Sequence, residues 1–401
     1  MPTTSRTYLP ADWQVWTYAP VAGKFRLDFS TLNGSDVLGG VSDTGSMTVL
    51  DVDINSIMIR DGERPQQSVF GSVSPATASI SMSTNTWNAN TVKELYAGKY
   101  IAITLKNQAI FDVDVYGKNA VFFLGTISSS TYQVDPINRI TTFVLEAVDI
   151  FSNAANSQIQ LVRSTTTGKA TSLLQAILNS NAGYDSHLVI LPDQDLASTS
   201  ETNTTEYRSL GEWIDDFVTT TVAIPISKYE LAPTLIRRVN LYPLFTQPTT
   251  GTQITDSMVT AVQMATDGDD IPTSFNLSNT TTIYSKGQNQ QGILTQPIDY
   301  TATLDVNGSS QLQAIADRIS SYKPKLSPIS ITIKTAQTFQ SIDFSNDPDY
   351  YFPNTWYPNG TNIDVYLAYF GNVHYYTKIV GQDHEITPDY WQTTYHLLKG
   401  L

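Results

Sequence analysis

Histidine is the side chain in this sequence best able to bind a transition metal, and the 401-residue chain contains four of them. They are His187, His374, His384 and His396, and the last three fall close together near the carboxyl end. Such spacing would suit a zinc site, because imidazole nitrogens are common zinc ligands. Cysteine is absent, which excludes thiolate ligands and disulfide bonds and is typical of a protein made in a reducing cytoplasm.

Carboxylates form the second group of residues that could do chemistry. Residues 266–270, TDGDD, resemble part of a calcium loop, but Ser274 stands where the loop needs a glutamate. Glu212, Asp215 and Asp216 would supply the paired acids of a glycosidase, yet they fall at a predicted helix start, where acids favour the helix dipole. Motifs of serine hydrolases, phosphate-binding loops and zinc proteases do not occur. We therefore predict no catalytic residue, no cofactor and no metal.

Aromatic side chains gather between prolines in residues 347–360, DPDYYFPNTWYPNG. Exposed rings of this kind stack on sugars or anchor a protein interface, and they also cover the edge of an adjacent barrel. We predict a core or subunit-interface role and keep a sugar platform as the alternative. The rings concerned are Tyr350, Tyr351, Phe352, Trp356 and Tyr357.

The elements that would position these residues are built around a repeat. Residues 121–147 and 373–399 align without a gap, and in both copies apolar residues alternate with period two, as in a half-buried strand. Each copy has a proline second in a predicted turn, followed by a second alternating strand. We predict two long β-hairpins, each of which closes a β-domain. The marker residues are Val121, Phe123, Ile127, Pro136, Phe143 and Leu145, matched by Val373, Tyr375, Ile379, Pro388, Tyr395 and Leu397.

The same alignment argues against a histidine metal site. It places His374 on Phe122, His384 on Tyr132 and His396 on Val144, so none of the three histidines has a ligand as its counterpart. We therefore predict structural roles for these three residues.

The order of strands, short helix, strand and closing hairpin occurs twice, which favours two antiparallel barrels or sandwiches. Between them, leucines at helical spacing in residues 170–181 and a capping box, Ser209 with Glu212, predict helices. A further capped helix is predicted from Ser310, and Asp61-Gly62 is predicted to turn the chain. The fold class is mainly β, with two duplicated β-domains, each with a helix, and a mixed α/β insert. The predicted domains are residues 1–152, 153–280 and 281–401.

Composition and charge narrow the classes of function. A net charge of −14 argues against binding nucleic acid by phosphate neutralisation, which needs clustered lysine and arginine. An acidic conduit, in contrast, would let DNA slide because phosphates would not adhere to it. There is no apolar run of about 18 residues, so we expect no membrane insertion. The amino-terminal segment lacks the pattern of a secretory signal.

A family resemblance then rests on particular stretches. Residues 47–61, TASISMS, LYAGKYIAITL, VFFLGTISSS and ITTFVLEAVDIFSNAAN resemble the first domain of bacteriophage tail hub proteins. The later stretch ILTQPIDYTATLDVNGSSQLQAIADRISSYKPKLSPISITI resembles their second barrel-and-helix module, whereas residues 157–278 match least.

The resemblance implies tube-type barrels, two per chain, and a homotrimer that joins a sixfold tail tube to a threefold fibre or spike. In such an assembly the two hairpins would help to line or brace the channel. It implies a non-enzymatic virion protein at the tail tip, synthesised in the host cytoplasm. The implied partners are the distal tail or tail tube protein, the tape measure protein and other minor tail proteins, with DNA only in transit. The alternatives are a hexameric distal tail protein with one barrel per chain, or a carbohydrate-binding or degrading virion protein.

Overall fold

The computed structural model places many separate segments of the chain. The described residues are 13–18, 47–62, 75–84, 95–105, 121–149, 151–152, 158–161, 167–169, 188–192, 197–199, 206–209, 211–212, 215, 223–231, 235–243, 248–265, 274–278, 283–287, 298–301, 326–334, 339–341, 351–353 and 357–398. The helices predicted at residues 170–181 and from Ser310, the acidic residues 266–270 and His187 lie outside them.

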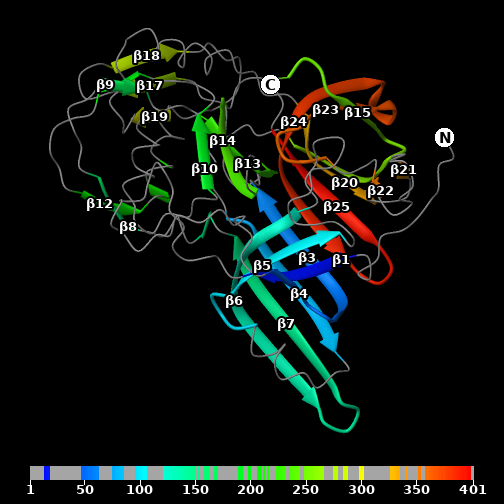
Figure 1. Ribbon diagram of the computed structural model, residues 1–401. Coiled ribbons are helices and arrows are strands. Elements are labelled where there is room, and N and C mark those ends of the chain that lie inside the picture. Colours follow the sequence, from blue (N-terminus) through cyan, green and yellow to red (C-terminus); the bar gives the residue numbers. More distant parts are fainter. Residues whose placement is uncertain are drawn as a thin grey trace.

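The described chain is organised by one large sheet of 13 strands, shown in Figure 1. Its main path runs through β16 (Val259–Ala265), β20 (Ser327–Lys334), β25 (Trp391–Leu397), β24 (Val373–Ile386), β3 (Asp53–Gly62), β4 (Thr77–Thr84), β7 (Ile140–Asp149), β6 (Val121–Asp135), β5 (Tyr100–Leu105), β1 (Trp13–Tyr18) and β2 (Met47–Val49). Off this path, β23 (Asn362–Leu367) pairs antiparallel with β24 and parallel with β15 (Thr252–Thr255). The predicted antiparallel β character is thus confirmed.

The two halves of the chain meet at the pairing of β3 with β24. These strands run antiparallel, from the pair Ile57 and Ile386 to the pair Gly62 and Gly381. Strands from both predicted β-domains therefore share one hydrogen-bonded sheet. The strands β15 and β16, which fall in the predicted insert, also pair with carboxyl-terminal strands. The three domain boundaries and the two barrels stay predictions.

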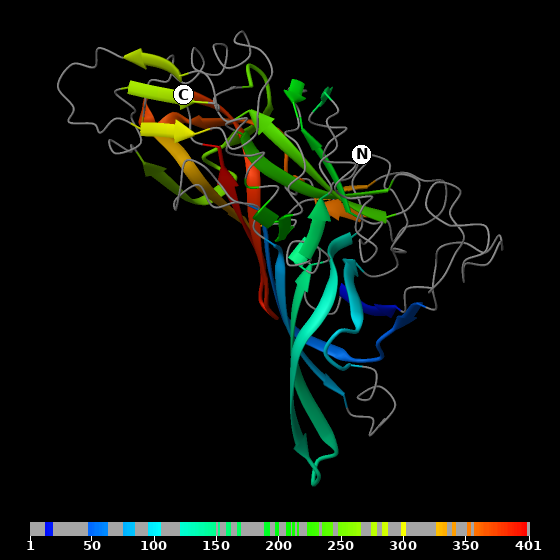
Figure 2. The same cartoon turned by 90° about the vertical axis from the view of Figure 1, so that its left-hand side faces the viewer.

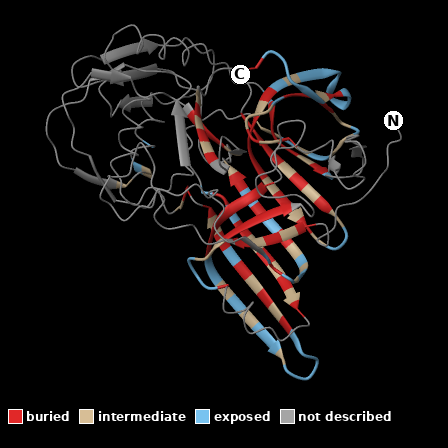
Figure 3. Ribbon diagram, in the orientation of Figure 1, coloured by how far each residue is buried: buried red, intermediate tan, exposed pale blue. Residues whose placement is uncertain are grey.

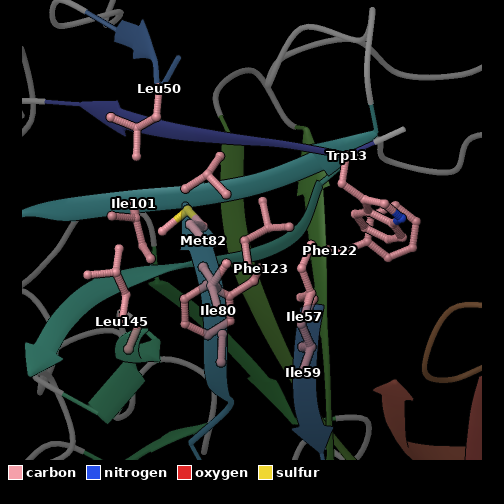
Figure 4. Close-up of a cluster of buried hydrophobic side chains, with 14 of the residues drawn as sticks. Trp13, Leu50, Ile57, Ile59, Ile80, Met82, Ile101, Phe122, Phe123 and Leu145 are labelled. Carbon is pink, nitrogen blue, oxygen red and sulfur yellow. The ribbon is translucent and has the colours of Figure 1, made fainter. Parts of the chain in front are cut away.

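Alternating side chains build the first core. In β4 the buried residues Ala78, Ile80 and Met82 are separated by less buried serines, so that one face of the strand is covered and the other is not. Figure 4 shows Ile80 and Met82 among side chains from neighbouring strands. Trp13 and Trp391 pack edge to face with ring centroids 5.0 Å apart. Because Trp391 comes from the carboxyl-terminal half, this core is shared between the two halves.

A second core lies between the strands of the carboxyl-terminal half. It is smaller than the first and includes residues from β15, the strand at residues 252–255. Its buried members are Ile254, Ile331, Ile333, Tyr357, Ile363, Val365, Leu367, Ile379, Tyr395 and Leu397.

The middle of the chain forms smaller sheets. In the principal one, β14 (Leu235–Pro243) pairs in parallel with β10 (Leu188–Pro192) and antiparallel with β13 (Ala223–Leu231). β13 lies against β3, β6 and β24 of the large sheet. Other short pairings join β8 (Gln158–Leu161) to β12 (Glu206–Ser209), β9 (Thr167–Lys169) to β11 (Ala197–Thr199), β17 (Ser274–Ser278) to β18 (Ile283–Gly287) and β19 (Ile298–Thr301), and β21 (Phe339–Ser341) to β22 (Tyr351–Pro353).

Two local predictions have different outcomes. The capping box is confirmed: Ser209 N donates to Glu212 Oε2 over 2.7 Å, Glu212 N donates to Ser209 Oγ over 3.2 Å, and residues 211–212 and 215 are helical. The prediction of a turn at Asp61-Gly62 is wrong, because both residues belong to β3. Gly62 has a φ of +81°, which suits glycine, and a Cβ there would lie 2.5 Å from the carbonyl oxygen of Val380. The glycine thus permits the close approach of β24.

Candidate assembly site: two hairpins and a buried junction

The strands β6 and β7 form the first predicted hairpin, here called hairpin 1. Its register runs from the pair Gly125 and Asp149 to the pair Asp135 and Ile140, with a bulge between Ile127 and Ser129. β5 pairs with β6 only over residues 121–126, so the outer part of β6 has β7 as its one strand partner within the described chain. Figures 1 and 2 show the turn projecting away from the other described strands.

The turn of hairpin 1 is organised by Asp135. Its Oδ1 accepts hydrogen bonds from the backbone N–H groups of Ile137 and Asn138, both over 3.0 Å, and Asn138 Nδ2 donates to Oδ2 over 2.7 Å. Hydrogen bonds from Asn138 lower the pKa of Asp135 because they favour its charged form. Arg139 has a φ of +57°, which returns the chain to β7. The turn that contains Asp135 and Pro136 is therefore fixed by side-chain hydrogen bonds.

Apolar side chains at the tip of hairpin 1 are left exposed. Ile137 is 89% exposed, Val134 47% and Ile140 37%. In Figure 3 the burial of hairpin 1 changes along its length, from buried residues near the middle of the sheet to exposed residues at the tip. Exposed apolar residues that cluster on a projecting element mark an interaction surface more often than scattered ones do.

The strands β24 and β25 form the second predicted hairpin, hairpin 2, and its turn begins on Thr387. Thr387 Oγ1 accepts hydrogen bonds from the backbone N–H groups of Asp389 and Tyr390 over 3.4 and 3.3 Å, and Thr387 N donates to the carbonyl oxygen of Tyr390 over 2.8 Å. Just beyond the turn, Trp391 is 1% exposed. Hairpin 2 is thus packed into the first core up to its turn, unlike hairpin 1.

The two hairpins share a bulge but differ in register. The bulge follows Ile127 in hairpin 1 and Ile379 in hairpin 2, as the alignment of the outgoing strands requires. On the return strand, however, Ile127 faces Ala147, whereas Ile379 faces Leu397. The ungapped alignment would pair Ile379 with residue 399, so the return strand of hairpin 2 is shifted by two residues relative to that alignment. Because side chains alternate between the two faces of a strand, a shift of two residues leaves each side chain on its original face. The predicted pattern of buried residues is therefore unchanged by this difference in register.

Most of the predicted hairpin markers are core residues. Two turn residues and two at the start of β24 are the exceptions: Pro136, Pro388 and Val373 are exposed, and Tyr375 is half-buried. The markers that lie in the cores are Val121, Phe123, Ile127, Phe143, Leu145, Ile379, Tyr395 and Leu397. These side chains hold the sheet together.

The histidines have separate partners. His384 is buried, its Nδ1 accepts a hydrogen bond from Trp391 Nε1 over 3.3 Å, and Thr393 Oγ1 lies 3.0 Å from the same nitrogen. Burial lowers the pKa of His384 to about 3, so the ring is neutral. His374 Nδ1 lies 2.8 Å from Asp364 Oδ2, and His396 Nε2 lies 3.1 Å from Asp383 Oδ2. Within the described part of the chain no three potential ligands come together around a possible metal ion.

Of the five rings in the predicted aromatic segment, Tyr357 is the one whose burial the structure describes. Tyr350 and Trp356 lie outside the described residues, and Tyr351 and Phe352 are in β22. Tyr357 is 9% exposed, and its backbone N–H donates to the hydroxyl of Tyr395 over 3.1 Å. Tyr357 is thus part of the second core. Exposed rings occur elsewhere in the described residues, at Tyr96, Tyr369, Phe370 and Tyr376, of which Tyr369 and Phe370 lie in the short η2 (Ala368–Phe370).

A buried polar junction was not predicted from the sequence. At its centre Arg237 of β14, 1% exposed, donates from Nη1 to Asp61 Oδ2 over 3.2 Å and from Nη2 to Asp61 Oδ1. Nη2 also donates to Ser227 Oγ over 2.8 Å and lies 3.4 Å from Asp149 Oδ2. The members of this Arg237 cluster are Asp61, Asp149, Ser227, Tyr229, Arg237 and Asn359.

The cluster connects four stretches of the chain, which contain Asp61, Asp149, residues 227–237 and Asn359. Asn359 Nδ2 donates to Asp61 Oδ2 over 3.1 Å and to the carbonyl oxygen of Ser227 over 2.9 Å. The guanidinium of Arg237 lies 4.6 Å from the ring centre of Tyr229, whose hydroxyl accepts from the backbone N–H of Leu124 over 3.0 Å. The sequence signals for the Arg237 cluster were Arg237 within the apolar strand β14 and Asp61 near the end of β3.

In the described residues no helix is long and apolar enough to cross a membrane.

Comparison with solved structures assigns the fold to the type found in phage tail proteins. The structure is similar to the tail protein from Neisseria meningitidis MC58, with a TM-score of 0.55 and 11% identity over 88% of this chain and 93% of that one. It is similar to the 43 kDa tail protein of prophage MuSo2 from Shewanella oneidensis, with a TM-score of 0.55 and 8% identity over 88% and 96%.

A third similar structure is a chain of the half-lidded Francisella PdpA-VgrG complex, with a TM-score of 0.50 and 10% identity over 96% of this chain and 58% of that one. No protein-family model matches the sequence. A search of curated proteins gave no match either. At these identities the likeness shows a shared fold, and the resemblance to tail proteins is confirmed at that level.

Proposed function

We propose that the protein is a non-enzymatic structural protein of a phage tail, forming a homotrimeric hub at its distal end. The observation that supports this most is the fold match to two tail proteins, which covers nearly the whole length of both this chain and theirs. A match that extends over both chains concerns the architecture and not a single shared module. The hub would join the sixfold tail tube to a threefold fibre or spike and enclose the DNA channel.

The arrangement of the hairpins supports separate parts in this assembly. Hairpin 2 is buried in the first core up to Trp391 and would brace the subunit. Hairpin 1 projects, with Ile137, Val134 and Ile140 exposed, and would contact a neighbouring subunit or the tube. The proposed partners are the distal tail or tail tube protein, the tape measure protein and other minor tail proteins. The net charge of −14 would let DNA pass without adhering.

The proposal is tested by the native mass of the purified protein, with and without the tail tube protein, and by single-particle imaging. A ring of three chains with six similar lobes around a hole is the expected result. A ring of six chains would instead identify a distal tail protein. A protein that stays monomeric even with the tube would contradict the hub.

A further inference from the structure

The Arg237 cluster holds unequal charge in the interior of the protein. Asp61, Asp149 and Arg237 are 4%, 0% and 1% exposed, so two carboxylates share one guanidinium away from water. With all three groups ionised the cluster would carry one uncompensated negative charge. Burying such a charge is costly, and a proton that neutralises one carboxylate removes the cost.

Hydrogen bonding decides which carboxylate takes the proton. Asp61 accepts two hydrogen bonds from Arg237 and one from Asn359, so both of its carboxylate oxygens have partners. Asp149 accepts a hydrogen bond from the backbone N–H of Ser152 over 3.0 Å, and a backbone hydrogen bond from Ala76 also favours its charged form. Its Oδ2 is 3.4 Å from Arg237 Nη2 and has no hydrogen-bond partner among the described residues. The proton is therefore best placed on Asp149.

The surroundings of Asp149 agree with this assignment. Burial raises the pKa of Asp149 to about 6, although Arg237 acts to lower it. The ionisable groups that face Asp149 are Arg237 on β14, Asp61 on β3 and, beyond the guanidinium, Tyr229 on β13. Burial raises the pKa of Tyr229, so that its phenol stays neutral. Asp149 is then the group of this cluster that titrates near neutral pH.

The position of the cluster makes this titration structural. Asp61 is the next-to-last residue of β3 and Asp149 is the last residue of β7, both in the large sheet, whereas Arg237 and Ser227 belong to β14 and β13. We propose that the Arg237 cluster is a proton-dependent latch that holds the β13–β14 pair against the large sheet. The latch is tight when the two carboxylates share one proton and looser when both are ionised.

The direction of the pH dependence follows from the raised pKa. A group whose pKa is higher in the folded than in the unfolded chain contributes stability that is complete below the unfolded value, here 3.8. That contribution is lost as the pH rises through the folded value of about 6. The latch therefore loosens as the pH rises from about 4 to just above 6, opposite to the usual behaviour of a surface carboxylate.

The test compares thermal unfolding of the full chain and of D149N at pH 5, 6, 7 and 8. Asparagine retains an acceptor for Ser152 N and cannot ionise, so D149N should gain in Tm relative to the unsubstituted protein as the pH rises. D135N is the matched control, because Asp135 ends the other strand of hairpin 1 but has a lowered pKa. Its difference from the unsubstituted protein should stay constant over this range. A constant difference for D149N would overturn the proposal.

Hydrogen exchange on the unsubstituted protein provides a test that does not depend on a variant folding. After correction for intrinsic rates, the opening constant of amides in β13 and β14 should rise by about tenfold from pH 5 to pH 8, since one pKa unit corresponds to a factor of ten. Amides at the centre of β4 should change much less. Equal changes in the two regions would overturn the latch, whatever the outcome for the trimeric hub.

Discussion

Hairpin 1 and hairpin 2 have the same plan and opposite surroundings. Both have a bulge after an isoleucine, and both turn at a hydrogen-bonding side chain followed by proline. Hairpin 2 ends against Trp13 and Phe122 in the first core, whereas hairpin 1 ends in solvent at Ile137. The difference teaches that similar local sequences can serve internal packing in one place and an external surface in another.

The largest expected effect comes from removing the buried end of hairpin 2. Replacing Trp391 with alanine leaves a cavity beside Trp13 and Phe122 and should lower the free energy of unfolding by about 3–5 kcal/mol. Chemical denaturation measures this loss. The control is Ile137→Ala in hairpin 1, where an 89% exposed side chain is removed and the change should be within about 0.5 kcal/mol. Equal losses of unfolding free energy would contradict the claim that hairpin 2 ends in the core and hairpin 1 ends in solvent.

A second substitution tests the base of hairpin 1. A Cβ on Gly125 would lie 2.1 Å from the carbonyl oxygen of Val148, which is backbone and cannot move aside. Gly125→Ala should therefore cost about 1–3 kcal/mol of unfolding free energy. The aligned residue in hairpin 2, Thr377, has room for a side chain whose Oγ1 donates to the carbonyl oxygen of Leu398 over 2.7 Å. Thr377→Ala leaves that acceptor unpaired and should cost less; a larger loss there would contradict this order.

A third change separates stability from assembly. Replacing Val134, Ile137 and Ile140 together with serine removes the apolar tip of hairpin 1 and should change the unfolding free energy by no more than about 1 kcal/mol. Assembly of the proposed hub, followed by native mass with the tube protein present, should be lost. Serine at the solvent-exposed Tyr369, also an apolar surface residue, is the matched control. Normal assembly of the triple variant would show that the tip is not a contact.

The smallest expected effect is a difference between the two hairpin turns in how their stability depends on pH. The lowered pKa of Asp135 means that its hydrogen bonds stabilise hairpin 1 above the unfolded pKa of 3.8 and are lost as the pH falls through the folded value. Asp135→Asn should therefore weaken the turn at pH 7 and have little effect at pH 2. The hydroxyl of Thr387 does not titrate, so Thr387→Val should weaken hairpin 2 equally at both values. Hydrogen exchange of the turn amides measures both.

The sequence alone was sufficient for the features that depend on neighbours along the chain. Alternating apolar residues located β4, β6 and β7, the prolines located both turns, and Ser209 with Glu212 located a helix start. The hydrophobic pattern of period two also predicted the buried face of both hairpins. Each of these signals comes from residues a few positions apart, whose contacts follow from local geometry.

Only the tertiary structure decided the register and the junction. A shift of two residues leaves the burial pattern unchanged, so hydrophobicity could not reveal that Ile379 faces Leu397 while Ile127 faces Ala147. The pair Asp61-Gly62 suggested a turn, and the sequence could not reveal the partners of Asp61 because they are distant along the chain. Arg237 is 176 positions away and Asn359 is 298. Contacts over such separations are set by how the sheets pack, and composition and spacing contain no record of that packing.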